Sequence, residues 1–227
     1  MKNELVIDQG NFENNIRFLE KVGNLTSEMK ILELGSGSGH MVKQLHDRGL
    51  NVIGTEVNPE YIAYAEEKFG IDLVLMSGDK LDFPDKSFDV VLSFDVFEHI
   101  SDSDLHLREV ARMLKDDGRY LLQTPNKLTN VIFEIIRNKS FTKWKEYHMS
   151  VHTYWQLKKR FSKNGYDYEF IIMPVVTDWY RNKVRKHLGG FGTFLLKVLN
   201  PDKWPWPIRT NFYLVTKKAH PDAGSAA

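Results

Sequence analysis

Short apolar runs that end in polar residues alternate with amphipathic segments over the first 125 residues. The runs at 31–35, 51–57, 71–79, 87–96 and 119–125 are rich in aliphatic and β-branched residues, which predicts buried strands. The segments between them predict helices, and Pro59 stands where the first turn of one of these helices is expected. Strands that alternate with helices predict a parallel sheet covered by helices on both faces.

The pattern is less regular in the C-terminal part of the chain. Residues 127–152 combine an apolar helical segment with aromatic and basic residues, and 153–163 predicts a helix. Two further strands are expected at 166–174 and 210–218, so a long insertion, 174–210, separates strands six and seven. We therefore expect an α/β protein with a Rossmann-like, doubly wound, seven-stranded and mostly parallel sheet, whose last strand is antiparallel.

The composition of the chain excludes several classes of protein and several kinds of catalysis. No uninterrupted apolar run approaches the roughly 20 residues of a membrane span, and the first residues lack the pattern of a secretory signal, so a soluble, cytoplasmic protein is expected. The chain has no cysteine, which excludes disulfides, a thiolate nucleophile and a cysteine-based zinc site. Catalysis must use carboxylates, histidines, hydroxyls or a cofactor.

Charge is distributed unevenly along the chain. Residues 1–126 carry 13 Lys+Arg against 23 Asp+Glu, a net charge of about −10, and residues 127–227 carry 18 against 7, a net charge of about +11. Two solvated surfaces that attract each other would explain this. The alternative is that the basic part meets an anionic partner, such as a phosphate, a carboxylate, a membrane surface or a nucleic acid.

A glycine-rich loop, "ELGSGSG", follows the first expected strand. Glycines at this place let the backbone turn sharply and approach a ligand, and the next helix offers free N–H groups. A mononucleotide P-loop would need a Gly-Lys pair that is absent. A dinucleotide-binding loop would need its third glycine where His40 stands, which makes a dehydrogenase a distant alternative.

Acidic residues stand at the ends of the expected strands, where ligands of parallel sheets bind. Glu33 lies two residues before the first glycine, Glu56 ends the second strand, Asp79 the third and Asp95 the fourth. A carboxylate such as Glu56 can accept two hydrogen bonds from ribose hydroxyls.

The loop and these strand ends resemble the motifs of class I S-adenosylmethionine-dependent methyltransferases. In that family the acid at the position of Glu33 helps to hold the methionine amino group, and an arginine before the first strand, here Arg17, can reach its carboxylate. The resemblance implies these further cofactor-binding residues: Gly35, Ser36, Gly37 and Gly39 in the loop, Glu56 and Val57 at the ribose, Asp79, Lys80 and Leu81 at the adenine, and Ser93, Phe94 and Asp95 on the fourth strand.

A closer resemblance, over residues 12–173, rests on "DVFEHI", "LKDDGRYLLQTPN" and "EYHMSVHTYWQLKKRFSKNGYDYEFI". These stretches are similar to the branch that contains the ubiquinone-pathway O-methyltransferases. The resemblance implies an enzyme that transfers the methyl of S-adenosylmethionine to a small molecule, leaving S-adenosylhomocysteine. Oxygen is favoured over nitrogen as the acceptor atom, because the "[DNS]PP[YFW]" motif of many N-methyltransferases is absent.

Histidines are the candidate general bases for an oxygen acceptor. His99 follows the fourth strand, and His148 and His152 lie in the segment that covers the substrate in related enzymes. Together with Glu98 they could also hold a divalent metal, which we do not predict.

Residues 1–218 are expected to form a single methyltransferase domain followed by a disordered tail, 219–227. Its expected parts are a helical N-terminal segment, 1–29, a cofactor-binding core, 30–126, a substrate-side segment, 127–173, and the basic and aromatic insertion, 174–210.

The acceptor and the partners stay open. The insertion would suit a lid, a dimer contact or a peripheral membrane contact, so the protein is expected to be a monomer or a homodimer, and the acceptor could be lipophilic or anionic. An RNA methyltransferase is the first alternative, although the missing N-methylation motif disfavours nucleic acid. The second is a cofactor-binding regulatory subunit without turnover.

Overall fold

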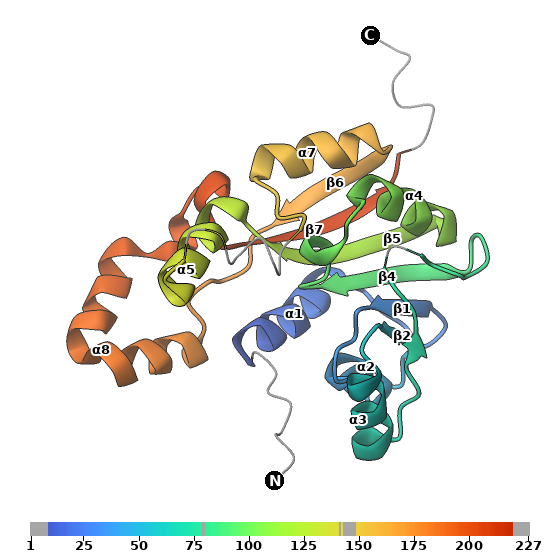
Figure 1. Ribbon diagram of the computed structural model, residues 1–227, viewed down its shortest axis with the longest axis horizontal. Helices are drawn as coiled ribbons and strands as arrows, with labels where there is room; N and C mark the ends of the chain where they lie inside the picture. Colours follow the sequence, from blue (N-terminus) through green and yellow to red (C-terminus); the bar gives the residue numbers. More distant parts are fainter. Residues whose placement is uncertain (1–8, 79, 141, 143–148, 220–227) are drawn as a thin grey trace.

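The computed structural model describes residues 9–78, 80–140, 142 and 149–219 of the chain (Figure 1). Its strands are β1 (Lys30–Leu34), β2 (Asn51–Glu56), β3 (Val74–Leu75), β4 (Phe88–Phe94), β5 (Leu114–Pro125), β6 (Tyr166–Ile171) and β7 (Asn211–Lys218). Its helices are α1 (Gln9–Val22), α2 (His40–His46), α3 (Pro59–Phe69), α4 (Ser103–Met113), α5 (Lys127–Asn138), α7 (Tyr154–Lys163) and α8 (Asp178–Leu199), with 3₁₀ turns η1 (Phe97–His99), η2 (Pro201–Lys203) and η3 (Trp206–Ile208).

The strands form one seven-stranded sheet in the order β3-β2-β1-β4-β5-β7-β6. Strands β1 to β5 pair in parallel, whereas β7 is antiparallel to both β5 and β6. The chain moves outward from β1 to β3 and then returns to the other side of β1, so the strand order reverses between β1 and β4. Ligands of such sheets bind at this reversal, outside the carboxyl ends of the strands. The predicted sheet, including its antiparallel last strand, is confirmed.

Side chains of successive strand residues enter two cores, one on each face of the sheet. On β1, Leu32 and Leu34 pack in a cluster with α4 and α7, while Ile31 packs with α1, α2 and α3. Tyr120 and Leu121 on β5 divide between the faces in the same way. Alternation of this kind follows from the two-residue period of a strand, and it explains why the central strands appear as continuous apolar runs.

Two strands differ most from their predicted bounds, and β6 also ends at Ile171, three residues before its predicted end. The third was expected at 71–79, but β3 contains only Val74 and Leu75, which are 38% and 64% exposed. It is an edge strand paired with β2 alone, so fewer contacts extend it. The fifth was expected to begin at 119, but β5 begins at Leu114, because Leu114 pairs with Phe88 before a bulge shifts the register.

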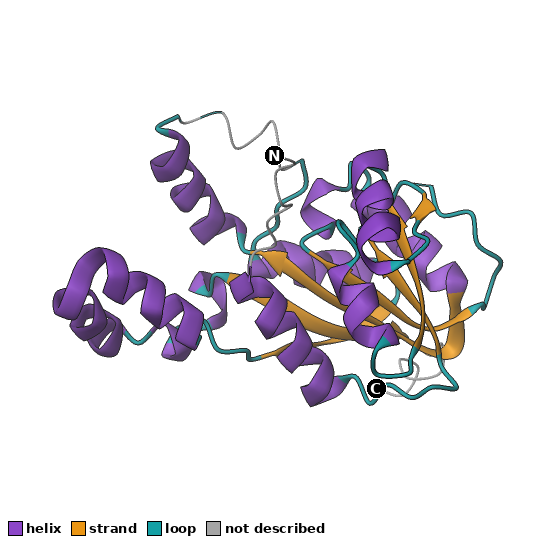
Figure 2. Cartoon of the chain, turned by 90° about the horizontal axis from the view of Figure 1, so that it is seen from below, coloured by secondary structure: helices purple, strands orange, loops and turns teal. Residues whose placement is uncertain are grey.

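The segment between β6 and β7 contains α8. Figures 1 and 2 show this helix at one end of the molecule, beyond the sheet. Thr177 accepts a hydrogen bond from the backbone N–H of Tyr180 at the start of α8, and Gly189 interrupts the helix with a φ of 59°. No helix in the described part of the chain is long and apolar enough to cross a membrane.

Candidate functional site

A cleft of about 370 Å³ opens at the carboxyl ends of β1 and β4, where the strand order reverses. Six of the predicted cofactor-binding residues line it: Glu33, Gly35, Ser36, Gly37, Phe94 and Asp95. Its volume lies within the range of small-molecule sites. We refer to it as the cofactor cleft.

The glycine loop needs backbone conformations that other residues rarely adopt. Gly35 has a φ of 63°, and a Cβ there would lie 2.5 Å from a methyl of Val96. Gly37 has a φ of 51°, and no atom lies within 4 Å of the position that its Cβ would take. Both residues therefore require glycine for their backbone, and the second also leaves space in the wall of the cleft.

Glu56 is held in place by three backbone N–H groups. Its Oε2 accepts a hydrogen bond of 2.7 Å from Gly37, and its Oε1 accepts hydrogen bonds of 2.8 and 2.9 Å from Val57 and Asn58. The side chain is 6% exposed. Because each carboxylate oxygen has two acceptor sites, Oε1 is fully used and Oε2 keeps one site for a hydroxyl donor.

Glu33 is a buried acid with an unused oxygen. The residue is 4% exposed, and its Oε2 has no hydrogen-bond partner. Burial, with a smaller effect from the charge of Glu56, raises the pKa of Glu33 to about 7. A buried carboxyl with one unpartnered oxygen in the wall of a cleft suits a cationic ligand group, so the site fits the ammonium of a methionine.

Asp95 lies at the floor of the same cleft in a strained conformation, with a φ of 55°. Its Oδ2 accepts a hydrogen bond of 2.9 Å from Asn11 on α1, and its Oδ1 accepts one of 3.0 Å from Gln123 on β5. Behind it, Glu98 is 2% exposed and accepts a hydrogen bond of 3.0 Å from Thr124. Burial and the charge of Asp95 hold the pKa of Glu98 well above its usual range.

Several predicted cofactor residues do not line this cleft. Arg17 is on the exposed side of α1, Val57 is 58% exposed, and Lys80 is exposed as well. Leu81 belongs to the core under α4, and Ser93 is fully buried within the sheet. Gly39 and Glu56 adjoin the cleft without lining it, and Asp79 lies outside the described residues.

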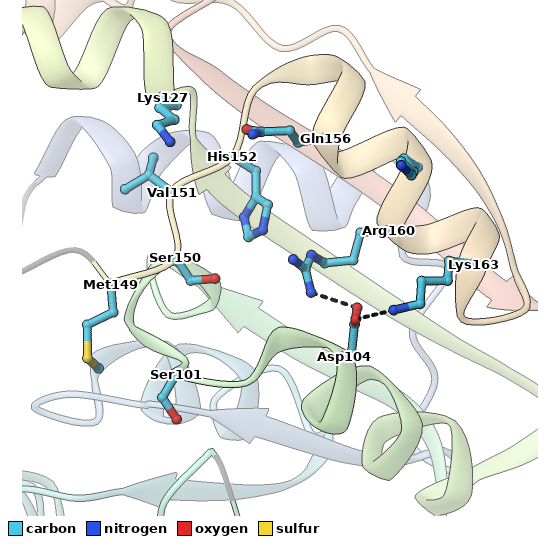
Figure 3. A pocket seen from close by; sticks show the side chains of 11 residues that line it. Ser101, Asp104, Lys127, Met149, Ser150, Val151, His152, Gln156, Arg160 and Lys163 are labelled. Carbon is cyan, nitrogen blue, oxygen red and sulfur yellow. Dashed lines mark hydrogen bonds and ion pairs between the residues drawn. The ribbon is translucent and has the colours of Figure 1, made fainter.

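Neither of the two described candidate histidines, His99 and His152, lines the cofactor cleft. His99 is in η1 with a side chain that is 47% exposed, and its Nε2 lies 4.0 Å from Glu98 Oε1. His152 is 6% exposed and lines a second pocket, between α4, α7 and residues 149–152 (Figure 3). His148 lies outside the described residues. Within the described ranges, no group of three or more His, Cys, Asp or Glu side chains could hold a metal ion.

Helix α1 supplies cleft residues that the sequence analysis missed. Asn11, Phe12 and Asn15 line the cofactor cleft, together with Ser38, His40, Met41 and Tyr61. Asn15 is 5% exposed and lies three residues before the fully buried Phe18. An amide on the apolar face of an amphipathic helix was the signal that could have identified it.

The known proteins that are similar to this chain include methyltransferases. Residues 32–122 match the family described as a methyltransferase domain. The uncharacterized methyltransferase YcgJ of Bacillus subtilis is 34% identical over 109 residues, which are 45% of this chain and 43% of that protein. The ubiquinone biosynthesis O-methyltransferase of Pelagibacter ubique is 30% identical over 122 residues, 51% of this chain and 50% of that protein. The chain thus spans about half the length of the curated relatives it matches.

Solved structures share the fold over nearly the whole chain. The crystal structure of YcgJ from Bacillus subtilis has a TM-score of 0.63 at 19% identity, covering 92% of this chain and 99% of that one. An S-adenosylmethionine-dependent methyltransferase from Mesorhizobium loti has a TM-score of 0.66 at 16% identity, covering 93% and 99%. Residues 32–122 therefore match a methyltransferase domain, the chain has the fold of these solved structures, and the predicted resemblance to S-adenosylmethionine-dependent methyltransferases is confirmed.

Proposed function

We propose that this protein transfers the methyl group of S-adenosylmethionine to a small-molecule acceptor, at an oxygen atom. The observation that carries the proposal is the unpartnered Oε2 of the buried Glu33 in a cleft beside the glycine loop. The relative named as a ubiquinone biosynthesis O-methyltransferase supports oxygen as the acceptor atom.

The residues of the cleft would hold the cofactor by charge and hydrogen bonding. Glu33 would accept hydrogen bonds from the methionine ammonium, and Glu56, oriented by Gly37, would accept one from a ribose hydroxyl. Asp95, fixed between α1 and β5, would border the reacting end. When bound, the cofactor supplies an electrophilic methyl on a sulfonium, and the protein mainly has to position the acceptor in line with it.

An acceptor hydroxyl must also lose its proton. His99 is our candidate for the general base, because it stands at the end of η1, four residues after Asp95, and its side chain reaches solvent. His99→Asn should lower kcat without changing the affinity for S-adenosylhomocysteine. An unchanged kcat across the pH range would assign the proton to another group.

Labelled methyl transfer tests the proposal. Purified protein is incubated with methyl-labelled S-adenosylmethionine and fractionated cell extract, and the products are identified by mass spectrometry. Label in a small molecule supports the proposal, whereas label only in RNA would establish an RNA methyltransferase. Tight cofactor binding with no labelled product from any fraction would favour a regulatory subunit. Glu33→Gln should lower the label wherever the wild type produces it.

We also propose that the protein binds membrane surfaces through α8. After the break at Gly189, Phe191, Phe194 and Val198 are 61–70% exposed and recur at spacings of three or four residues, so they share one face of the second half of the helix. The first half of α8 is basic, with exposed Arg181, Arg185 and Lys186. An apolar face beside basic residues fits an anionic lipid surface, which would also suit a lipophilic acceptor.

Vesicle flotation tests this placement. The protein should float with phosphatidylglycerol-rich vesicles at low salt and much less with phosphatidylcholine alone. Phe191→Ser with Phe194→Ser should abolish flotation, whereas Leu75→Ser, an equally exposed site on β3, should not. If the wild type is a dimer that does not float with vesicles, and the variant with both phenylalanines replaced is a monomer, α8 is a contact between two copies instead.

A further inference from the structure

A second pocket lies on the other side of η1 from the cofactor cleft. It is formed by the start of α4, by α7, by the first residue of α5 and by residues 149–152, and its volume is about 540 Å³ (Figure 3). It shares no lining residue with the cofactor cleft. The buried ring of Phe97 in η1 packs 5.5 Å from the ring of His152, which lines this pocket.

The walls of this pocket are strongly basic. Four cationic side chains line it, Lys127, Lys159, Arg160 and Lys163, against the single carboxylate of Asp104. Asp104 is already engaged, because its oxygens lie 2.6 Å from Arg160 Nη1 and 2.7 Å from Lys163 Nζ. Among the described side chains, no carboxylate pairs with Lys127 or Lys159. A surplus of positive charge therefore faces the pocket.

Two polar atoms in the wall lack a partner. Arg160 Nε and His152 Nδ1 are both buried and make no hydrogen bond. Asp104 orients the guanidinium of Arg160 through Nη1 and leaves its Nε edge unused, which is a geometry that oxyanions take. Since buried polar atoms normally have partners, these two atoms call for a ligand that accepts hydrogen bonds.

The cations act on His152 as well. Burial, Arg160 on α7 and Lys127 on α5 lower the pKa of His152 to about 4, against an opposing effect from Asp104 on α4. An anion in the pocket would offset the two cations and raise the pKa of His152. Proton uptake by this histidine therefore reports on occupancy of the pocket.

We propose that the second pocket binds an oxyanion, a phosphate or a carboxylate, contacted by Arg160, Lys127 and His152. The ligand chemistry has two sources: an anionic group on the methyl acceptor or a separate small anion. The site is independent of the methyltransferase assignment, because it uses none of the residues of the cofactor cleft.

Inorganic phosphate is the probe for the test. Histidine ring resonances are followed by NMR while phosphate is added to the whole protein at pH 5 and constant ionic strength, and the pH titration of His152 is repeated with and without phosphate. The His152 resonance should move saturably at millimolar phosphate, and its pKa should rise by at least one unit. Lys127→Met should weaken the phosphate affinity at least fivefold, and Lys159→Met on α7 provides a second variant if the first loses stability.

Lys68→Met, at an exposed lysine on α3, is the control with the same change of charge and should leave the titration unchanged. A His152 resonance that does not respond to 50 mM phosphate would overturn the proposal, as would an identical response in both pocket variants. Phosphate that competes with the labelled acceptor identifies the anion as part of the acceptor, whereas phosphate binding without competition identifies a separate anion.

Discussion

Binding of S-adenosylhomocysteine should release a proton from Glu33. In the free protein, burial raises the pKa of this carboxyl to about 7, so about half of the molecules carry the proton at pH 7 and about nine tenths at pH 6. The ligand ammonium binds the carboxylate and not the acid, and it stays charged throughout this pH range. The affinity should therefore rise with pH through this window.

The size of the effect follows from the protonated fraction. The proton weakens binding about twofold at pH 7 and about elevenfold at pH 6, so the affinity should fall about fivefold between the two. Calorimetry measures it directly: titrations in buffers of different ionisation enthalpy should give about half a proton released at pH 7 and about 0.9 at pH 6.

Glu33→Gln should bind about tenfold more weakly or worse at pH 7.5, because a charge-assisted hydrogen bond is lost, and its proton release should vanish. Glu60→Gln, at an exposed acid on α3, is the control and should behave as the wild type. Equal affinity of the wild type at pH 6 and pH 7, or proton release that survives in Glu33→Gln, would refute the role given to this carboxyl.

Three further predictions follow from individual residues. Gly35→Ala should lose about 2 kcal/mol or more of folding stability in denaturant titration, because the left-handed backbone with a φ of 63° alone costs about 1–2 kcal/mol and the added Cβ also meets Val96. Stability within about 0.5 kcal/mol of the wild type would contradict this. Glu56→Gln should weaken S-adenosylhomocysteine about tenfold or more, because one acceptor oxygen becomes a donor facing N–H groups; unchanged calorimetric affinity would exclude the carboxylate as a ligand. The pKa of His152 is lowered from 6.5 to about 4 in the folded state, so the unfolded chain takes up the proton first as pH falls. About 3 kcal/mol of folding stability should therefore be lost between pH 6.5 and pH 4. His152→Gln should remove this loss.

Local patterns were sufficient to predict the central sheet and the glycine loop. Glu33 and Glu56 could be located because each stands near the end of an apolar run that a glycine or a proline follows within a few residues. All of these signals lie close together in the sequence. The bounds of β3 and β5 could not, because they depend on pairing with β2 and β4, which are distant in the chain. The turn-like "KDDG" of residues 115–118 is a bulge inside β5, held in the sheet by that pairing.

The same limit applies to the catalytic candidates. The sequence made both His99 and His152 candidates for the substrate side of the site. The structure leaves the side chain of His99 in η1 exposed, whereas His152 lines the second pocket together with Lys127 and Arg160. Which pocket a side chain enters is decided by how helices pack on the sheet, and no periodicity along the chain contains that information. The cleft contribution of Asn11 was missed for the same reason.

A crystal structure with S-adenosylhomocysteine tests the central claim most directly. The ligand should occupy the cleft at the carboxyl ends of β1 and β4, with its amino group within hydrogen-bond distance of Glu33 and its ribose hydroxyls at Glu56. A saturated crystal in which this cleft stays free of the ligand, or in which the ligand contacts neither carboxylate, would contradict the account.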